Sequence, residues 1–208
     1  MNLPNKITTF RMVCVVLIIG ILAPSFFGAN LFPEVFNING QILTLDYLIA
    51  FVLFVVASFS DFLDGHIARK YNLVTTYGKF MDPIADKLLV DSLFIIVASK
   101  YPTLVLVAVI MIARDLVVDG VKLIAAGKNK IVAANMWGKA KTVAQMVALA
   151  FLLFGNWPFS YFDSEMYLTT GFNVSIILCY IAGILSLMSM IVYIYQNREV
   201  FKDSPKED

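Results

Sequence analysis

The sequence is poor in cysteine, histidine and charge. Of its 208 residues two are cysteine, one is histidine and 15% are charged. Cys14 and Cys179 each lie inside a hydrophobic run without metal-type spacing, so we interpret both as packing residues rather than as disulfide partners or metal ligands. We see no repeat, no low-complexity stretch and no soluble domain, and we expect no nucleic-acid partner.

Apolar residues are abundant. They make up 60% of the chain, and the mean hydropathy is +0.80, which is too apolar for an ordinary soluble domain. Six segments approach the roughly 20 apolar residues that a membrane-spanning helix needs. They are Phe10–Phe27, Leu45–Leu63, Asp82–Lys100, Thr103–Leu123, Gly138–Phe154 and Val174–Tyr195. The sequence therefore predicts an all-α integral membrane protein, a bundle of six transmembrane helices that forms a single domain over residues 1–208.

The net charge of +1 hides an uneven distribution of lysine and arginine. These residues precede the first segment, join segments two to three and four to five, and recur in the tail, whereas Gly28–Asp46 and Gly155–Phe172 contain none. The positive-inside rule then places residues 1–11 and the tail, 197–208, in the cytoplasm, as parts of a multi-pass protein of the cell membrane. Asn30–Gln41 is expected to be an external loop and the tail to be frayed. The alternative that the first segment is a signal peptide is disfavoured, because no convincing cleavage site follows it.

Four aspartates flank the junction between the second and third segments. Asp61 and Asp64 are three residues apart, and Asp82 and Asp86 are four apart, so each pair shares one helix face. Two antiparallel helices can therefore direct four carboxylates to one point. The small residues Gly65, Ala68 and Gly78 lie on the same faces and would let a nucleotide or pyrophosphate approach the backbone, although small residues also favour plain helix packing.

Ionisable groups at membrane depth are costly and usually functional. Oxygen ligands prefer Mg²⁺ or Mn²⁺, so we expect two such ions between the four aspartates, where they would stabilise charge on a phosphoryl group. The alternative is a solvated face whose acids pair with nearby lysine and arginine. Asp91 is half a helical turn from Asp82, so we expect it to face away from the metals.

The stretch from Asp61 to Asp86 resembles a known signature. Asp61-Phe-Leu-Asp64-Gly65-His-Ile-Ala68-Arg69, eight further residues, and Gly78-Lys-Phe-Met-Asp82-Pro-Ile-Ala-Asp86 match that of the CDP-alcohol phosphotransferase family. The resemblance implies a six-helix membrane fold, usually a homodimer, with its active site at the cytoplasmic boundary.

The resemblance also implies roles for individual residues. Asp61, Asp64, Asp82 and Asp86 would hold metal, Asp86 would also be the general base, and Asp61, Gly65, Ala68, Arg69, Thr75 and Gly78 would contact CDP-diacylglycerol. The segment Asn5-Lys-Ile-Thr8-Thr-Phe-Arg11 is similar to the family's entry motif, which implies that Asn5 and Thr8 reach the cytidine or its phosphates. Asn and Thr before a helix also commonly cap it.

Basic residues in the later segments bear on the acceptor. Arg114 lies midway along the fourth segment, where it either pairs with Asp115 or Asp119 or grips an acceptor phosphate. Lys139 and Lys141 begin the fifth segment, near a helix N-terminus that suits anions, although flanking cations are also ordinary there. Gly138–Met146 and Ile112–Asp115 are similar to the matching stretches of family members that use glycerol 3-phosphate, except that Asp115 stands where many carry Glu.

The cations fit an anionic acceptor, and the resemblance implies a transferase that moves a phosphatidyl group from CDP-diacylglycerol to glycerol 3-phosphate and releases CMP. The same transfer to inositol phosphate or a small alcohol remains an alternative. An ion transporter is a second alternative, which the clustering of the acids on one side disfavours.

Overall fold

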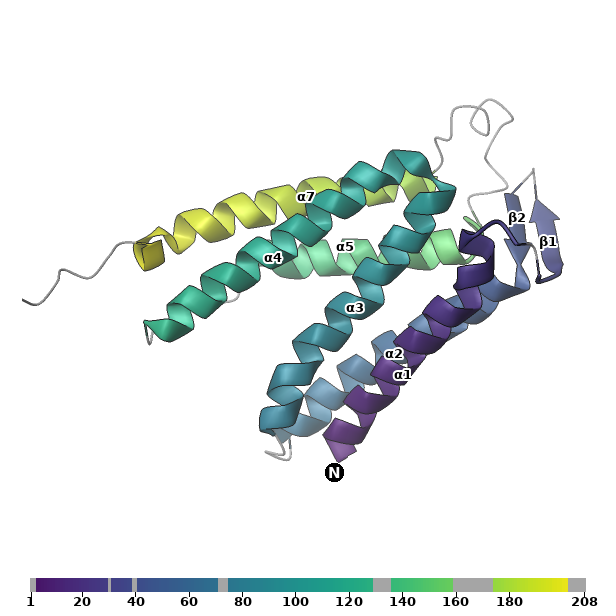
Figure 1. Ribbon diagram of the computed structural model, residues 1–208. Helices are drawn as coiled ribbons and strands as arrows, with labels where there is room; N and C mark the ends of the chain where they lie inside the picture. The colour runs from purple at the N-terminus through teal and green to yellow at the C-terminus, as the bar shows by residue number, and fades with distance from the viewer. Residues whose placement is uncertain are drawn as a thin grey trace, which may run out of the picture.

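The computed structural model of the protein describes residues 3–29, 31–38, 41–70, 75–128, 136–158 and 174–201. For residues 3, 4, 38, 41, 62–70, 76 and 79 it describes the course of the backbone but not the side chains. Apart from one short hairpin, the regular structure of the described ranges is helical (Figure 1).

Six long helices overlap the six predicted segments. They are α1 (Leu3–Phe26), α2 (Leu45–Lys70), α3 (Thr76–Lys100), α4 (Val105–Gly127), α5 (Met136–Leu153) and α7 (Val174–Gln196). The prediction that these six segments are helical is confirmed, whereas their spanning of a membrane stays a prediction. Helices α1 and α3 begin earlier, and α2 ends later, than the hydrophobic segments do, because polar residues at their ends continue the helix.

A short antiparallel hairpin lies in the segment that we predicted to be a loop. Strand β1 (Glu34–Ile38) pairs with β2 (Gln41–Thr44), and Phe36 stands opposite Leu43. Leu43 is 1% exposed, and the Phe36 ring lies 6.4 Å from the ring of Phe154. The prediction of a loop over Asn30–Gln41 is wrong for Glu34–Ile38, which is a strand, and these two apolar side chains pack on the core.

The helices form two groups, which are joined by contacts of α3 with α4 and α5 and of α2 with α5. Helix α1 packs against α2 and α3, while α7 packs against α4 and α5, and α3 also contacts α4 and α5. Figure 1 shows α1, α2 and α3 as one group and α4, α5 and α7 as the other. A 3-10 helix, η1 (Pro102–Leu104), turns the chain from α3 into α4, with proline at its start, where a missing N–H costs least.

The buried side of α1 follows helical spacing. Thr8, Arg11, Val15, Ile18 and Leu22 are each 3% exposed or less, and they lie three or four residues apart. Because this stripe packs on α2 and α3, α1 is a part of the core, which disfavours the signal-peptide alternative.

Both cysteines pack in the core. Cys14 is 1% exposed and Cys179 is 0% exposed, and neither forms a disulfide. The prediction of two packing residues is confirmed.

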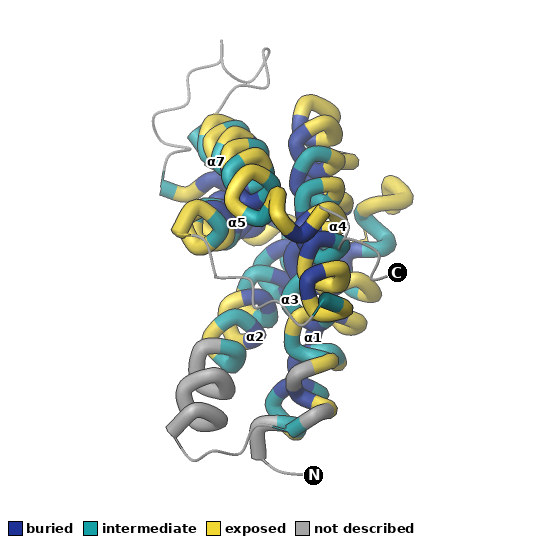
Figure 2. Tube along the Cα trace, turned by 90° about the vertical axis from the view of Figure 1, so that its left-hand side faces the viewer, coloured by how far each residue is buried: buried dark blue, intermediate teal, exposed yellow. Residues whose placement is uncertain are grey.

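The outer faces of the helices carry large apolar side chains. Val16 of α1 is 68% exposed and Ile191 of α7 is 63% exposed, and Figure 2 shows exposed residues along the outer side of α7. The stretches Asn5–Phe26 and Val174–Gln196 are long and apolar enough to cross a membrane. Extended apolar surfaces suit contact with lipid better than contact with water.

The start of the tail is ordered, contrary to our expectation of a frayed tail. Residues Arg198–Phe201 form a 3-10 helix, η3. Val200 is 4% exposed, and the Lys128 Nζ donates a hydrogen bond to its carbonyl oxygen at 2.9 Å. This contact attaches η3 to the end of α4.

Candidate active site

A cavity of about 330 Å³ is lined by residues of α2, α3, α4 and α5. Its lining is mostly charged, which is unusual for a space inside a helix bundle. The charged residues are Asp61, Asp82, Asp86, Lys87, Asp91, Arg114, Asp115, Lys122 and Lys141. The cavity thus joins the predicted carboxylate site to two of the three predicted acceptor residues.

Three of the four predicted metal ligands line this cavity. Asp61 comes from the C-terminal part of α2, and Asp82 and Asp86 lie one turn apart on α3. The side chains of Asp61 and Asp86 are 38% and 44% exposed, so a solute in the cavity can reach them. We call Asp61, Asp82 and Asp86, with Arg11, the carboxylate cluster.

Helix α1 contacts all three carboxylates. The Thr8 hydroxyl donates a hydrogen bond to Asp82 Oδ1 at 2.7 Å. Arg11 Nη1 donates to Asp86 Oδ1 at 2.5 Å, and Arg11 Nη2 lies 2.7 Å from Asp61 Oδ1. Arg11 is 0% exposed, so one buried guanidinium links α1, α2 and α3.

Our sequence analysis quoted Arg11 at the end of the entry motif but assigned it no role of its own, and so missed these contacts. The signal was its position one turn after Thr8, on the otherwise apolar buried stripe of α1. An arginine on a buried helix face needs an acidic partner, and the aspartates of α2 and α3 were the available ones.

Three residues predicted to hold the nucleotide form a small network beside Asp82. The Thr75 hydroxyl donates to Asn5 Oδ1 at 2.6 Å and accepts from the Gly78 N–H at 3.0 Å. A Cβ on Gly78 would lie 3.4 Å from Thr75 Oγ1 and 3.6 Å from Asp82 Oδ2. Thr75 is thus the N-cap of α3, whereas Asn5 and Thr8 lie inside α1 and do not cap it.

The other predicted residues of this region lie outside the described side chains. These are Asp64, Gly65, Ala68 and Arg69, all within the part of α2 whose backbone alone is described. Among the described side chains, no group of three or more His, Cys, Asp or Glu is arranged to hold a metal ion. The oxygen donors of Asp61, Asp82 and Asp86 fit a hard divalent cation in their chemistry, but they do not by themselves form a closed site.

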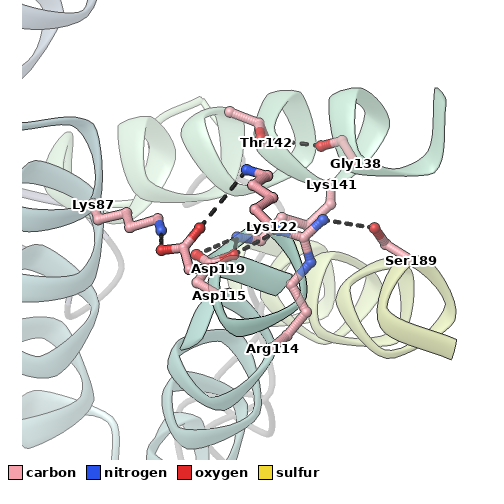
Figure 3. A network of polar contacts seen from close by, with 9 residues as sticks. All are labelled: Lys87, Arg114, Asp115, Asp119, Lys122, Gly138, Lys141, Thr142 and Ser189. Atoms are coloured by element: carbon pink, nitrogen blue, oxygen red, sulfur yellow. Dashed lines mark hydrogen bonds and ion pairs between the residues drawn. The ribbon is translucent and has the colours of Figure 1, made fainter. Parts of the chain in front are cut away.

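Arg114, Asp115 and Lys141 form a second cluster, which we call the cation cluster (Figure 3). Arg114 Nη1 donates to Asp115 Oδ1 at 2.6 Å, and Lys141 Nζ donates to Asp115 Oδ2 at 2.8 Å. Arg114 Nη2 also donates to the Ser189 hydroxyl of α7 at 2.7 Å. The three charged residues are nearly buried, with side-chain exposures of 12%, 10% and 4% in that order.

Gly138 on α5 leaves space for the guanidinium of Arg114. A Cβ on Gly138 would lie 3.1 Å from Arg114 Nη2, closer than side chains usually pack. Of the two structural pairs that the sequence left open for Arg114, the pair with Asp115 forms, whereas Asp119 pairs with Lys87 and, at 3.7 Å, with Lys122. Because Arg114 pairs with Asp115 and also lines the cavity, the structural and binding roles are compatible.

Two residues lie differently from our expectation. Asp91 lines the cavity, although we expected it to face away from the metals and to lie outside the site. Half a turn separates it from Asp82, but the cavity extends around α3 towards α4 and α5. Lys139 is exposed on α5 and is absent from the cavity lining, unlike Arg114 and Lys141.

The arrangement gives one cavity two kinds of charge. Half-exposed carboxylates can hold a cation or accept a proton, while a guanidinium and an ammonium group can bind a phosphate. A reaction between two phosphate-bearing molecules, of which one loses a hydroxyl proton, uses both. Soluble cations and anions can thus meet at one place in an otherwise apolar molecule.

Comparison with known proteins identifies relatives along nearly the whole chain. Residues 1–195 match the family described as CDP-alcohol phosphatidyltransferase. A Bacillus subtilis protein named CDP-diacylglycerol–glycerol-3-phosphate 3-phosphatidyltransferase is 36% identical over 204 residues, which cover 98% of each chain. Proteins of the same name from Mycoplasma pneumoniae and Haemophilus influenzae are 36% and 32% identical, over 97% and 93% of this chain and 89% and 91% of theirs.

Proposed function

Since the chain belongs to the CDP-alcohol phosphatidyltransferase family, we propose that it transfers a phosphatidyl group from CDP-diacylglycerol to glycerol 3-phosphate. The products are phosphatidylglycerophosphate and CMP, and the reaction is a step of phospholipid synthesis. The observation that carries the proposal is the cavity that the carboxylate cluster shares with Arg114 and Lys141. The names of the relatives support the choice of glycerol 3-phosphate.

The nucleotide end of CDP-diacylglycerol is proposed to bind beside Asp82. Asn5, Thr75 and Gly78 are joined there by hydrogen bonds, and Thr8 bonds to Asp82 itself. Gly65, Ala68 and Arg69 complete this proposed site from α2.

Asp61, Asp64, Asp82 and Asp86 are proposed to hold two Mg²⁺ or Mn²⁺ ions. Such ions, when bound, stabilise the charge on the transferred phosphoryl group and on the departing CMP. In the described contacts, Asp61 and Asp86 each use Oδ1 towards Arg11. Arg11 therefore fixes the position of both carboxylates while their second oxygens can serve a ligand.

Asp86 is the proposed general base. Its side chain is 44% exposed and lines the cavity, so the terminal hydroxyl of glycerol 3-phosphate can approach it. Asp86 accepts the proton of this hydroxyl while the hydroxyl oxygen attacks the β-phosphorus of CDP-diacylglycerol. The new P–O bond forms on that phosphorus, and the bond to the α-phosphate oxygen breaks and releases CMP.

Arg114 and Lys141 are the proposed partners of the acceptor's phosphate. Asp115 holds both cations at the cavity wall and offsets part of their mutual repulsion. Lys139 adds positive charge at the start of α5 from outside the cavity lining. An anionic acceptor suits this end of the cavity better than choline or ethanolamine does.

The six long helices are proposed to span the cell membrane, with both termini and the active site in the cytoplasm, and the protein to form a homodimer. The positive-inside pattern and the exposed apolar faces of α1 and α7 support the spanning topology. Labelling of a single cysteine introduced at Asn197 tests the orientation, since a reagent that cannot cross the membrane should label it only in inverted vesicles. Native mass spectrometry in detergent tests the dimer, and a purely monomeric spectrum would contradict it.

An acceptor panel tests the activity. Purified protein receives CDP-diacylglycerol and Mn²⁺ with glycerol 3-phosphate, inositol phosphate or serine, and CMP release is measured. We expect release with glycerol 3-phosphate, loss of release after chelation, and recovery when Mn²⁺ or Mg²⁺ returns. CMP release with another acceptor but not with glycerol 3-phosphate would refute the proposed acceptor.

A further inference from the structure

Gln145 is a buried residue of the cavity that the proposed mechanism leaves without a role. It lies on α5 one turn after Lys141, is 2% exposed, and lines the same cavity. Its amide nitrogen has no hydrogen-bond partner among the described residues.

A buried amide donor without an acceptor is unfavourable, and native proteins contain few. An apolar side chain of the same length would pack in this place without that penalty. The position of Gln145 on the cavity wall supplies a reason for the amide, because a bound molecule can accept the hydrogen bond that the protein does not.

Glycerol 3-phosphate has three polar groups, and the mechanism assigns two of them. Arg114 and Lys141 bind the phosphate, and Asp86 accepts the proton of the reacting terminal hydroxyl. The hydroxyl on the middle carbon, which does not react, has no assigned partner.

Among the described residues of the lining, the uncharged polar side chains are those of Thr142 and Gln145. The Thr142 hydroxyl donates to the Gly138 carbonyl oxygen within α5 at 3.1 Å. Gln145 is therefore the uncharged lining residue whose donor is available to a ligand.

We propose that Gln145 is a specificity residue for the acceptor, whose amide donates a hydrogen bond to the middle hydroxyl oxygen of glycerol 3-phosphate. This assignment rests on the proposed function. It predicts that the enzyme distinguishes glycerol 3-phosphate from 3-hydroxypropyl phosphate, which keeps the phosphate and the reacting hydroxyl but lacks the middle one. With that analogue the amide has no acceptor at the middle carbon.

The test measures kcat/KM for both acceptors in the wild type and in Gln145→Met, which keeps the length of the side chain but lacks the donor. We expect the wild type to prefer glycerol 3-phosphate by about tenfold, the usual size of one well-placed hydrogen bond. In Gln145→Met we expect this preference to fall to about twofold or less, through lower efficiency with glycerol 3-phosphate.

The outcomes separate the inference from the function on which it rests. No turnover of glycerol 3-phosphate by the wild type would refute the proposed function. Turnover of both acceptors with equal efficiency by the wild type would overturn the role of Gln145, without need of any variant. An unchanged preference in Gln145→Met, or an equal loss with both acceptors, would overturn it too, and Gln145→Leu repeats the comparison if the first variant does not fold.

Ser186→Ala is the matched control. Ser186 on α7 is 0% exposed and its hydroxyl also has no partner among the described residues, but it does not line the cavity. We expect its removal to leave the acceptor preference unchanged. A loss of preference equal to that in Gln145→Met would show that any buried polar change relaxes the site, and would overturn the specific role.

Discussion

The carboxylate cluster and the cation cluster face one cavity but differ in charge and in exposure. Three aspartates and Arg11 give the described carboxylate cluster a formal charge of −2, whereas two cations and Asp115 give the cation cluster +1. Asp61 and Asp86 are 38% and 44% exposed, but Lys141 and Asp115 are only 4% and 10% exposed. The carboxylates are therefore open to solutes, while the cations are desolvated and tightly paired.

Each cluster contains one buried residue of the opposite charge. Counted over the whole residue, Arg11 is 0% exposed and Asp115 is 8% exposed. Burying an ion pair gains little net stability, because desolvation offsets the attraction. What these two residues provide is position, since each holds two like-charged groups at the cavity wall. The two clusters are therefore built in the same way with opposite charges: a buried residue of one sign holds two residues of the other sign.

The largest expected effect is at the carboxylate cluster. Asp86→Asn keeps the shape of the side chain but removes the base, so we expect kcat to fall by about 10³-fold. Binding of CDP-diacylglycerol, measured by equilibrium dialysis of a labelled analogue, should be partly retained. Asp91→Asn is the control, because Asp91 lines the cavity from the same helix without a described contact to α1. Near-normal turnover by Asp86→Asn would remove Asp86 as the base.

The next effect tests whether Arg11 positions the carboxylates. Arg11→Met leaves Asp61 and Asp86 without their shared partner, so we expect a loss of about 2 kcal/mol in stability; the usual cost of breaking a buried pair is reduced here because both aspartates are half exposed. Thermal unfolding in detergent without divalent ions measures it. Arg11→Lys keeps the charge but cannot span two carboxylates. Its stability should therefore lie between that of the wild type and that of Arg11→Met. If Arg11→Met is as stable as the wild type, Arg11 does not hold the two carboxylates in position as Asp115 holds the two cations.

The carboxylate cluster was predictable because its aspartates lie in one continuous stretch. A spacing of three residues places Asp61 and Asp64 on one face of α2, and a spacing of four places Asp82 and Asp86 on one face of α3. Arg11 was not predictable in the same way, because a cation before an apolar helix already has an ordinary explanation in the positive-inside rule. Its role depends on how α1 rotates against α2 and α3, which local sequence does not determine.

The cation cluster was predicted only in part, because its contacts join distant helices. Arg114 and Lys141 could be chosen as candidates, but the bond from Lys141 to Asp115 depends on how α4 and α5 are both packed on α7. That Asp91 lines the same cavity could not be predicted for a related reason. Helical periodicity gives an angle around the axis of α3, and it does not say how far a neighbouring cavity extends around that axis.

A smaller effect is expected at the cation cluster. Arg114→Gln and Lys141→Met each remove one charged hydrogen bond to the acceptor's phosphate, so we expect the KM for glycerol 3-phosphate to rise by about tenfold or more. The KM for CDP-diacylglycerol should change by about twofold at most. Lys122→Met is the control, since Lys122 lines the cavity but lies 3.7 Å from Asp119 and is 59% exposed. Equal effects in all three variants would mean that the cavity responds to total positive charge alone.

The smallest effect is expected for Lys139, which our sequence analysis grouped with Lys141. Lys139 is exposed and outside the cavity lining, so it can act on an anionic acceptor only through solvent. Lys139→Ala should raise the KM for glycerol 3-phosphate by about twofold at low ionic strength, and the difference should disappear near 0.5 M salt, because salt screens exposed charges. The increase caused by Arg114→Gln should persist at that salt concentration, because Arg114 is largely buried and is screened less. A tenfold, salt-resistant increase in Lys139→Ala would instead place Lys139 in direct contact with the bound acceptor, and the cation cluster would then extend beyond the cavity.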